Sequence, residues 1–133
     1  MKIKISFIVV IISLLLTSYV NGQSILASEK NTLDSIKSEL NKAKNLDEKE
    51  KLHELLDKTY ENITTRFRYE GDFDKTIFYL EEAMNVALEG KRFKVYATLL
   101  NNKGLVLKEI GRHQEALECF YKSLKIKISC YIK

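Results

Sequence analysis

Four side chains of this 133-residue chain are of the types most often found in catalytic or metal centres. They are His53, His113, Cys119 and Cys130. Histidine and cysteine serve as proton carriers, nucleophiles and zinc ligands, but those roles need partners at set spacings. No HExxH, paired-cysteine or acidic-loop motif surrounds these residues, so we expect neither a metal nor another cofactor. His113 is better explained as a packing residue at a helix turn.

The two cysteines are predicted to be unpaired. They are eleven positions apart, or about 16 Å along a helix, which exceeds the reach of a disulfide. The sequence also contains no glycine-rich phosphate loop and no serine elbow. The neighbouring acids Glu81 and Glu82, and likewise Glu48 and Glu50, have lysines nearby and fit solvated helix faces. We therefore expect a protein that is not an enzyme and has no catalytic residues.

Composition points to one all-α domain. The chain has no proline, no tryptophan and only five glycines, with 45% hydrophobic and 30% charged residues. Lysine, glutamate, leucine and alanine dominate, and these residues lose little side-chain freedom in a helix. A chain of this length allows a single domain at most.

Residues 1–22 have the layout of a signal peptide. A basic "MKIK" precedes the apolar "ISFIVVIISLLL" and the polar "TSYVNGQ". Val20 and Gly22 are small enough for cleavage before Gln23, which predicts an exported protein, periplasmic or secreted, from a bacterium. An uncleaved membrane anchor is the alternative, although the apolar run is shorter than the roughly 20 residues of a spanning helix.

Charge is distributed unevenly along the rest of the chain. Residues 23–90 contain ten basic and fifteen acidic residues, whereas residues 91–133 contain ten basic and three acidic ones. The basic residues recur at helical spacing and no aromatic ladder accompanies them. We therefore expect solvated helix faces or an acidic protein neighbour, and not nucleic acid.

The strongest pattern is an internal repeat. The stretch "RFRYEGDFDKTIFYLEEAMNVAL" (66–88) aligns with "VLKEIGRHQEALECFYKSLKIKI" (106–128) at an offset of 40 residues. Gly71 then matches Gly111, and Thr76 matches Ala116. A fixed period of this length predicts stacked helical units that bury their apolar faces against one another.

Each unit is predicted to be a pair of helices. Gly71 and Gly111 are expected to end the first helices in the left-handed conformation, and Asp72 or Asp74 to cap the next helix. Gly104 and Ala116 are expected where two helices approach closely. Apolar spacing predicts these core residues: Leu52, Leu55, Leu56, Tyr60, Ile63, Phe67, Phe73, Ile77, Leu80, Met84, Leu88, Phe93, Tyr96, Leu100, Leu107, Ile110, Leu117, Phe120 and Leu124.

These units resemble the tetratricopeptide repeat. The second unit matches its pattern with Gly104, Leu107, Gly111, His113, Ala116, Phe120 and Ser123. The first unit matches less well, with Thr64, Phe67, Gly71, Phe73, Thr76, Leu80 and Ala83. Both units lack the proline that follows the second helix in this family, and the period is 40 and not 34. The longer turn "EGKRF" accommodates both departures.

The resemblance implies an α-solenoid of about five helices after the signal peptide. Residues 23–46 are expected to form a degenerate half-repeat that caps the stack, or an unrelated packing helix. Residues 47–90 and 91–128 form the two repeats, and residues 129–133 form a short tail.

The resemblance also implies a peptide-binding groove lined by the first helix of each unit. Asparagine amides could hold a peptide backbone, and Arg68 and Lys108 could attract a carboxylate. The family's clamp for C-terminal carboxylates is not reproduced. Position by position, the groove residues implied are Lys58, Glu61, Asn62, Thr65, Arg68, Thr98, Asn101, Asn102, Leu105 and Lys108.

The function expected is therefore non-catalytic binding of a protein or peptide. Export signal, half-repeat and repeats resemble the sensor regions of bacterial histidine kinases and related signal-transduction proteins, of which this chain would be a truncated fragment. The helix ending in "SLKIKI" also has an apolar face that nothing later in the sequence would cover. The alternatives are an assembly subunit that forms a homodimer through this C-terminal face, and a nonfunctional truncated product.

Overall fold

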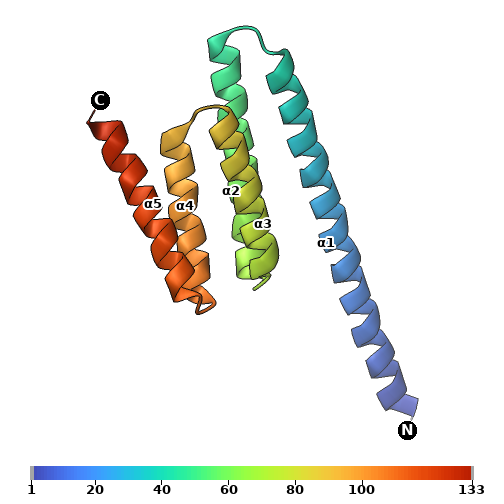
Figure 1. The fold of residues 1–133 in the computed structure, drawn as a ribbon. Helices are drawn as coiled ribbons and strands as arrows, with labels where there is room; N and C mark the ends of the chain where they lie inside the picture. Colours follow the sequence, from blue (N-terminus) through green and yellow to red (C-terminus); the bar gives the residue numbers. More distant parts are fainter. Residues whose placement is uncertain (1, 133) are drawn as a thin grey trace. The chain divides into compact units, whose positions relative to one another are not determined.

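The protein is all-α, as predicted. The computed structural model describes the backbone of residues 2–132 and the side chains of residues 12–14, 16–17 and 22–132. In that range it contains helices and no strand (Figure 1). The helices are α1 (Lys2–Lys42), α2 (Leu46–Tyr69), α3 (Phe73–Glu89), α4 (Phe93–Glu109) and α5 (His113–Tyr131).

The chain divides into two compact units, Met1–Leu56 and Asp57–Lys133. In the first unit, α1 continues through Gly22, so the expected boundary between residues 22 and 23 is not a helix break. Asn45 begins α2, because its Oδ1 accepts a hydrogen bond from the Glu48 amide at 2.7 Å. Among the side chains of this unit that the structure describes, the buried ones are Leu33, Ile36, Ala43 and Leu56.

Most of the predicted signal peptide, residues 1–22, lies outside the side chains that the structure describes. Its cleavage before Gln23 stays a prediction. Among the residues described, no helix combines the length and the hydropathy that crossing a membrane requires.

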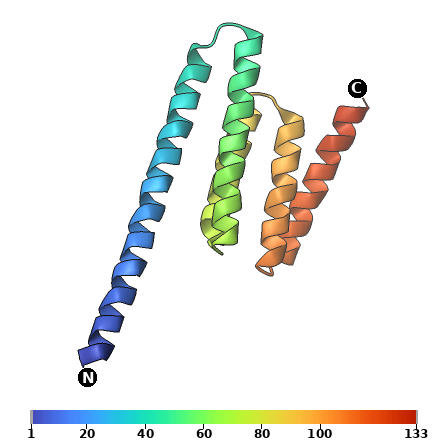
Figure 2. The same cartoon turned by 180° about the vertical axis from the view of Figure 1, so that it is seen from behind.

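In the second unit, successive helices run antiparallel and pack against their neighbours. Figures 1 and 2 show α3, α4 and α5 side by side with alternating directions, and α4 packs most extensively against α5. The α2 segment from Asp57 joins α3 through Phe67 and Tyr79, whose rings stack with centroids 5.7 Å apart. The second unit is therefore a series of helical hairpins.

The two glycine turns match the prediction. Gly71 has φ +75° and Gly111 has φ +81°, the left-handed conformation that glycine adopts without strain. The amide after each glycine bonds a carbonyl five residues back, Asp72 N to Phe67 O at 2.9 Å and Arg112 N to Leu107 O at 2.8 Å. This pairing is the Schellman motif, which satisfies carbonyls at a helix C-terminus. Asp72, and not Asp74, caps α3 by accepting from the Lys75 amide.

The turn between α3 and α4 uses the same motif with a lysine in the glycine position. Lys91 has φ +53°, and the Arg92 amide bonds Ala87 O at 2.7 Å. A residue with a Cβ in this conformation costs about 1–2 kcal/mol.

We expect Lys91→Gly to raise the free energy of unfolding by about 0.5–1 kcal/mol, after allowing for the entropy of glycine. Urea unfolding measures the change, and Lys91→Ala, which keeps the Cβ, is the control that should gain nothing comparable.

The predicted core is confirmed in the helix interiors and wrong on several flanks. Leu56, Tyr60, Ile63, Phe67, Leu80, Met84, Leu100 and Leu107 are buried. Leu55, Leu88, Phe93, Leu117 and Leu124 are exposed instead. On α5 the buried positions are the small residues Ala116, Cys119 and Ser123. Small side chains at these three positions let α5 lie close to α4, and the larger Phe120 ring is accommodated beside Gly104.

Gly104 and Ala116 are at this close contact, as predicted. A Cβ placed on Gly104 would lie 2.6 Å from Cε1 of Phe120, and Ala116 is buried. Ser123 joins the same pair of helices, because its buried hydroxyl donates to the Ala97 carbonyl at 2.6 Å. Small residues on both helices therefore set the distance between α4 and α5.

Candidate binding groove

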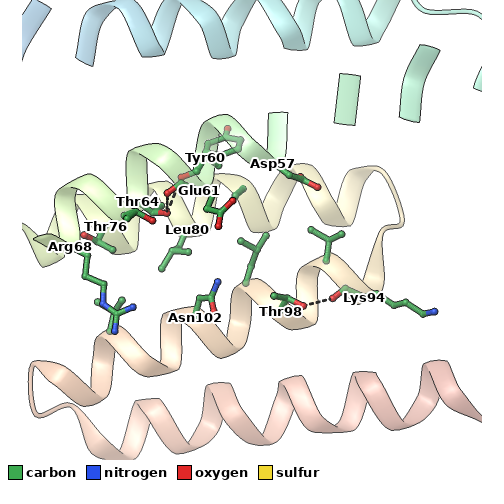
Figure 3. A pocket seen from close by; sticks show the side chains of 15 residues that line it. Asp57, Tyr60, Glu61, Thr64, Arg68, Thr76, Leu80, Lys94, Thr98 and Asn102 are labelled. Atoms are coloured by element: carbon green, nitrogen blue, oxygen red, sulfur yellow. Dashed lines mark hydrogen bonds between the residues drawn. The ribbon is translucent and has the colours of Figure 1, made fainter. Parts of the chain in front are cut away.

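A groove of about 540 Å³ lies within the second unit. The α2 segment from Asp57 and helix α4 form its walls, and α3 contributes to its floor (Figure 3). The lining residues are Asp57, Tyr60, Glu61, Thr64, Thr65, Arg68, Thr76, Leu80, Ala83, Lys94, Val95, Thr98, Leu99, Asn102 and Val106.

The floor is apolar. Leu80 and Ala83 come from the buried stripe of α3, and Val106 comes from α4. Thr76 is the polar member of that stripe, and its hydroxyl is satisfied by donating to the Asp72 carbonyl at 2.8 Å. A ligand in the groove would therefore bury apolar surface at the floor without leaving this hydroxyl unsatisfied.

The walls carry short polar side chains. Thr64 and Thr98 donate their hydroxyl hydrogens to helix carbonyls one turn back, Tyr60 O at 2.9 Å and Lys94 O at 3.1 Å. Their oxygens are left to accept hydrogen bonds from a ligand. The side chain of Asn102 points into the groove (Figure 3). It makes no hydrogen bond with another described residue. Its amide offers one acceptor and two donors, which suits a peptide backbone.

Ion pairs join the two walls at both ends of the groove. Arg92, which precedes α4, binds the Asp57 carboxylate through both guanidinium Nη atoms, with Nη1 at 3.0 Å from Oδ1. At the other end Arg68 of α2 binds Glu109 of α4, with Nε at 3.0 Å from Oε2. Both pairs are bidentate, the geometry in which arginine and carboxylate bind most strongly.

The ion pair between Arg68 and Glu109 shifts the pKa of both side chains. The hydrogen bond from Arg68 holds the pKa of Glu109 below its ordinary value of 4.5, and the hydrogen bond to Glu109 raises the pKa of Arg68. A carboxyl with a depressed pKa stabilises the fold above its unfolded-state pKa. That contribution is lost as the pH falls through the lower, folded-state pKa.

We therefore expect Glu109→Gln to lower the free energy of unfolding by about 0.5 kcal/mol at pH 7, since the pair is partly exposed. The difference from the unmodified protein should shrink as the pH falls below about 4.5, because the unfolded-state carboxyl is protonated there and the native carboxyl only at lower pH. Urea unfolding at pH 7, 4 and 3 measures it. Glu89→Gln is the control, because Glu89 is also the last residue of its helix, is exposed, and forms no ion pair with a described residue. A constant difference across this pH range would contradict the assignment.

The structure places some of the implied groove residues in the groove and leaves others outside it. Thr65, Arg68, Thr98 and Asn102 line it, as does Glu61. Arg68 is already engaged by the chain's own Glu109, so it is not an open site for a ligand carboxylate. The residues that do not line the groove are Lys58, Asn62, Asn101, Leu105 and Lys108.

Several residues that line the groove were not predicted from the sequence pattern. Asp57, Thr64, Lys94, Val95, Leu99 and Val106 were not among those implied. Most of them lie next to an implied residue, and one position along a helix turns the side chain by about 100°. The two ion pairs were not predicted either, because their members are far apart in sequence. Arg92 is 35 residues from Asp57, and Glu109 is 41 residues from Arg68.

The two cysteines and His113 do not line the groove. Cys119 and Cys130 are both free thiols, and burial raises the pKa of Cys119, which disfavours the reactive thiolate. Among the residues that the structure describes, no group of three or more His, Cys, Asp or Glu side chains could hold a metal ion. His113 is exposed at the start of α5.

Comparison with known proteins gives no match: no family model, curated protein or solved structure is significantly similar to this chain. What the geometry itself defines is an all-α protein whose second unit is built of helical hairpins with a groove between α2 and α4.

Proposed function

We propose that this chain is a non-catalytic binding module of the tetratricopeptide type that holds an extended peptide segment of a protein partner in the groove. The offset of 40 residues supports the repeat assignment. Gly71 and Gly111 share the left-handed turn, and Thr76 and Ala116 are both buried at the start of the second helix. Ala83 of α3 and Ser123 of α5 are also 40 residues apart, and both are buried.

The observation that supports binding most directly is the pairing of an apolar floor with an unengaged amide on the wall. Leu80, Ala83 and Val106 offer surface for a side chain, and Asn102 can bond a peptide carbonyl and amide together. Recognition of this kind combines backbone hydrogen bonds with pockets for alternate side chains.

The ion pairs at the two ends of the groove favour a ligand without charge at those two positions. Arg68 and Asp57 are each neutralised by a partner within the chain. An acidic peptide would have to displace Glu109 before it could bind Arg68. The ligand class is therefore an extended, largely apolar peptide held through its backbone.

The test is a selection of random linear peptides on the immobilised protein, followed by fluorescence anisotropy with one labelled selected peptide. Asn102→Ala should raise the dissociation constant about tenfold, the effect of losing one or two net hydrogen bonds. Asn101→Ala is the matched control: it removes the same amide from the neighbouring position, outside the groove. Its affinity should stay within about twofold of the unmodified protein.

Two results would overturn the proposal. One is a selection that yields no peptide binding above background with correctly folded protein. The other is a selected peptide whose affinity is insensitive to Asn102→Ala. A larger effect at Asn101 than at Asn102 would move the binding surface to the neighbouring face of α4, outside the groove.

We place this module in an exported sensor or scaffold protein of a bacterium. The support is the basic, apolar and polar succession of residues 1–22. Mass spectrometry of the protein recovered from the cell envelope and medium tests the export step. An N-terminus at Gln23 is expected, and an N-terminus at Met1 would contradict cleavage.

A further inference from the structure

Helix α5 has a second apolar stripe that faces away from α4. Leu117, Tyr121, Leu124, Ile128 and Tyr131 recur at alternating intervals of four and three residues. All five are exposed, Leu117 at 61% and Leu124 at 56%. This spacing is the a/d pattern of a two-helix seam, about 21 Å long from first to last residue. We call these five residues the α5 seam.

The seam is separate from both the hairpin contact and the groove. The face of α5 that packs on α4 is made by Ala116, Cys119 and Ser123, on the other side of the helix. No residue of α5 lines the groove. An apolar stripe of this regularity on a solvated helix indicates a partner helix and not scattered surface apolar residues.

Charges beside the seam indicate which helix that is. Glu118 and Lys125 are seven residues apart, at the same flank of the seam. Both are exposed, and neither forms an ion pair with another described residue. If a second α5 lies antiparallel across the seam, Tyr121 meets Leu124 of the other copy, and Leu117 meets Ile128. The same register brings each Glu118 to the Lys125 of the other copy.

We propose that the α5 seam binds a second copy of this chain, in an antiparallel, two-fold arrangement fixed by two symmetric Glu118–Lys125 ion pairs. A two-fold contact uses one surface twice, so that surface must be complementary to itself. The seam meets this condition in its apolar layers and in its charges. The groove stays open in such a dimer, so this proposal is independent of the function proposed for the groove.

The test is sedimentation velocity of the full chain over a range of concentrations. The unmodified protein should show a monomer–dimer equilibrium. Glu118→Lys and Lys125→Glu each turn two attractive pairs into repulsive ones, and each variant alone should raise the dimer dissociation constant at least about tenfold. An equimolar mixture of the two variants should recover the dimer, because each repulsive pair becomes attractive in the mixed species.

Recovery of the dimer in the mixture shows that the single variants fail to dimerise because of charge repulsion at the seam. A variant that failed because it was misfolded would not be rescued by adding the other variant. Lys122→Glu, the same charge change away from the seam, is the control and should leave the dissociation constant within about threefold. A monomer at all concentrations would overturn the proposal and assign the seam to a different protein. Association that persists in Leu124→Glu, or no recovery in the mixture, would also overturn it.

Discussion

Replacing Leu107 by alanine is expected to lower the free energy of unfolding by about 2–5 kcal/mol. Leu107 is 1% exposed and belongs to the cluster that joins α3, α4 and α5, together with Met84, Leu100 and Cys119. Truncation removes buried apolar surface and leaves a cavity among helices that cannot close over it. Urea unfolding followed by circular dichroism measures the loss.

The control for this prediction is on the same helix. Leu105→Ala makes the same chemical change two positions away, where the side chain is 38% exposed and outside the core cluster. Its cost should be about 1 kcal/mol or less, because little surface returns to water. Equal losses at the two positions would contradict the packing of α4 described above.

The second large effect concerns Gly104. Helix propensity alone predicts that Gly104→Ala stabilises α4 by about 1 kcal/mol. The added Cβ would lie 2.6 Å from the Phe120 ring, which is packed against the core cluster and must shift. Overpacking of this kind costs about 1–3 kcal/mol, so we expect a net loss of up to about 2 kcal/mol.

A double-mutant cycle separates the two terms. Phe120→Leu removes the ring atoms that the new Cβ would meet. In that background Gly104→Ala should be neutral or stabilising, so the loss of stability disappears or becomes a gain. If alanine at position 104 destabilises the protein equally with and without the ring, the close approach of α4 and α5 is not the cause.

The helices and their turns could be predicted from the sequence because they depend on local signals. Gly71 and Gly111 end their helices because glycine adopts the left-handed conformation without strain. Asp72 caps α3 because its side chain accepts a hydrogen bond from the Lys75 amide. The large apolar residues proved less informative. Leu117 and Leu124 follow a regular stripe, but the burial of Ala116 and Ser123 instead depends on how closely two helices approach. That distance is a property of the packed hairpin.

The groove was predicted as a surface but not residue by residue. Of the residues implied on α4, Thr98 and Asn102 line the groove, whereas Asn101 and Lys108 lie outside it. Helical spacing predicts which face of a helix lines a groove only to within one residue. An error of one residue turns the side chain by about 100° around the helix axis. The role of Arg68 could not be predicted either, since it depends on a carboxylate that only folding brings to the guanidinium.

The ion pairs at the two ends of the groove have a consequence for the affinity of binding and its salt dependence. Asp57–Arg92 and Arg68–Glu109 tether one wall to the other at both ends, so the width of the groove is set before any ligand arrives. A preorganised site loses little conformational entropy on binding, which favours affinity at a given contact area. Salt screens partly exposed pairs, so added salt should loosen the two tethers and weaken the binding even of an uncharged peptide.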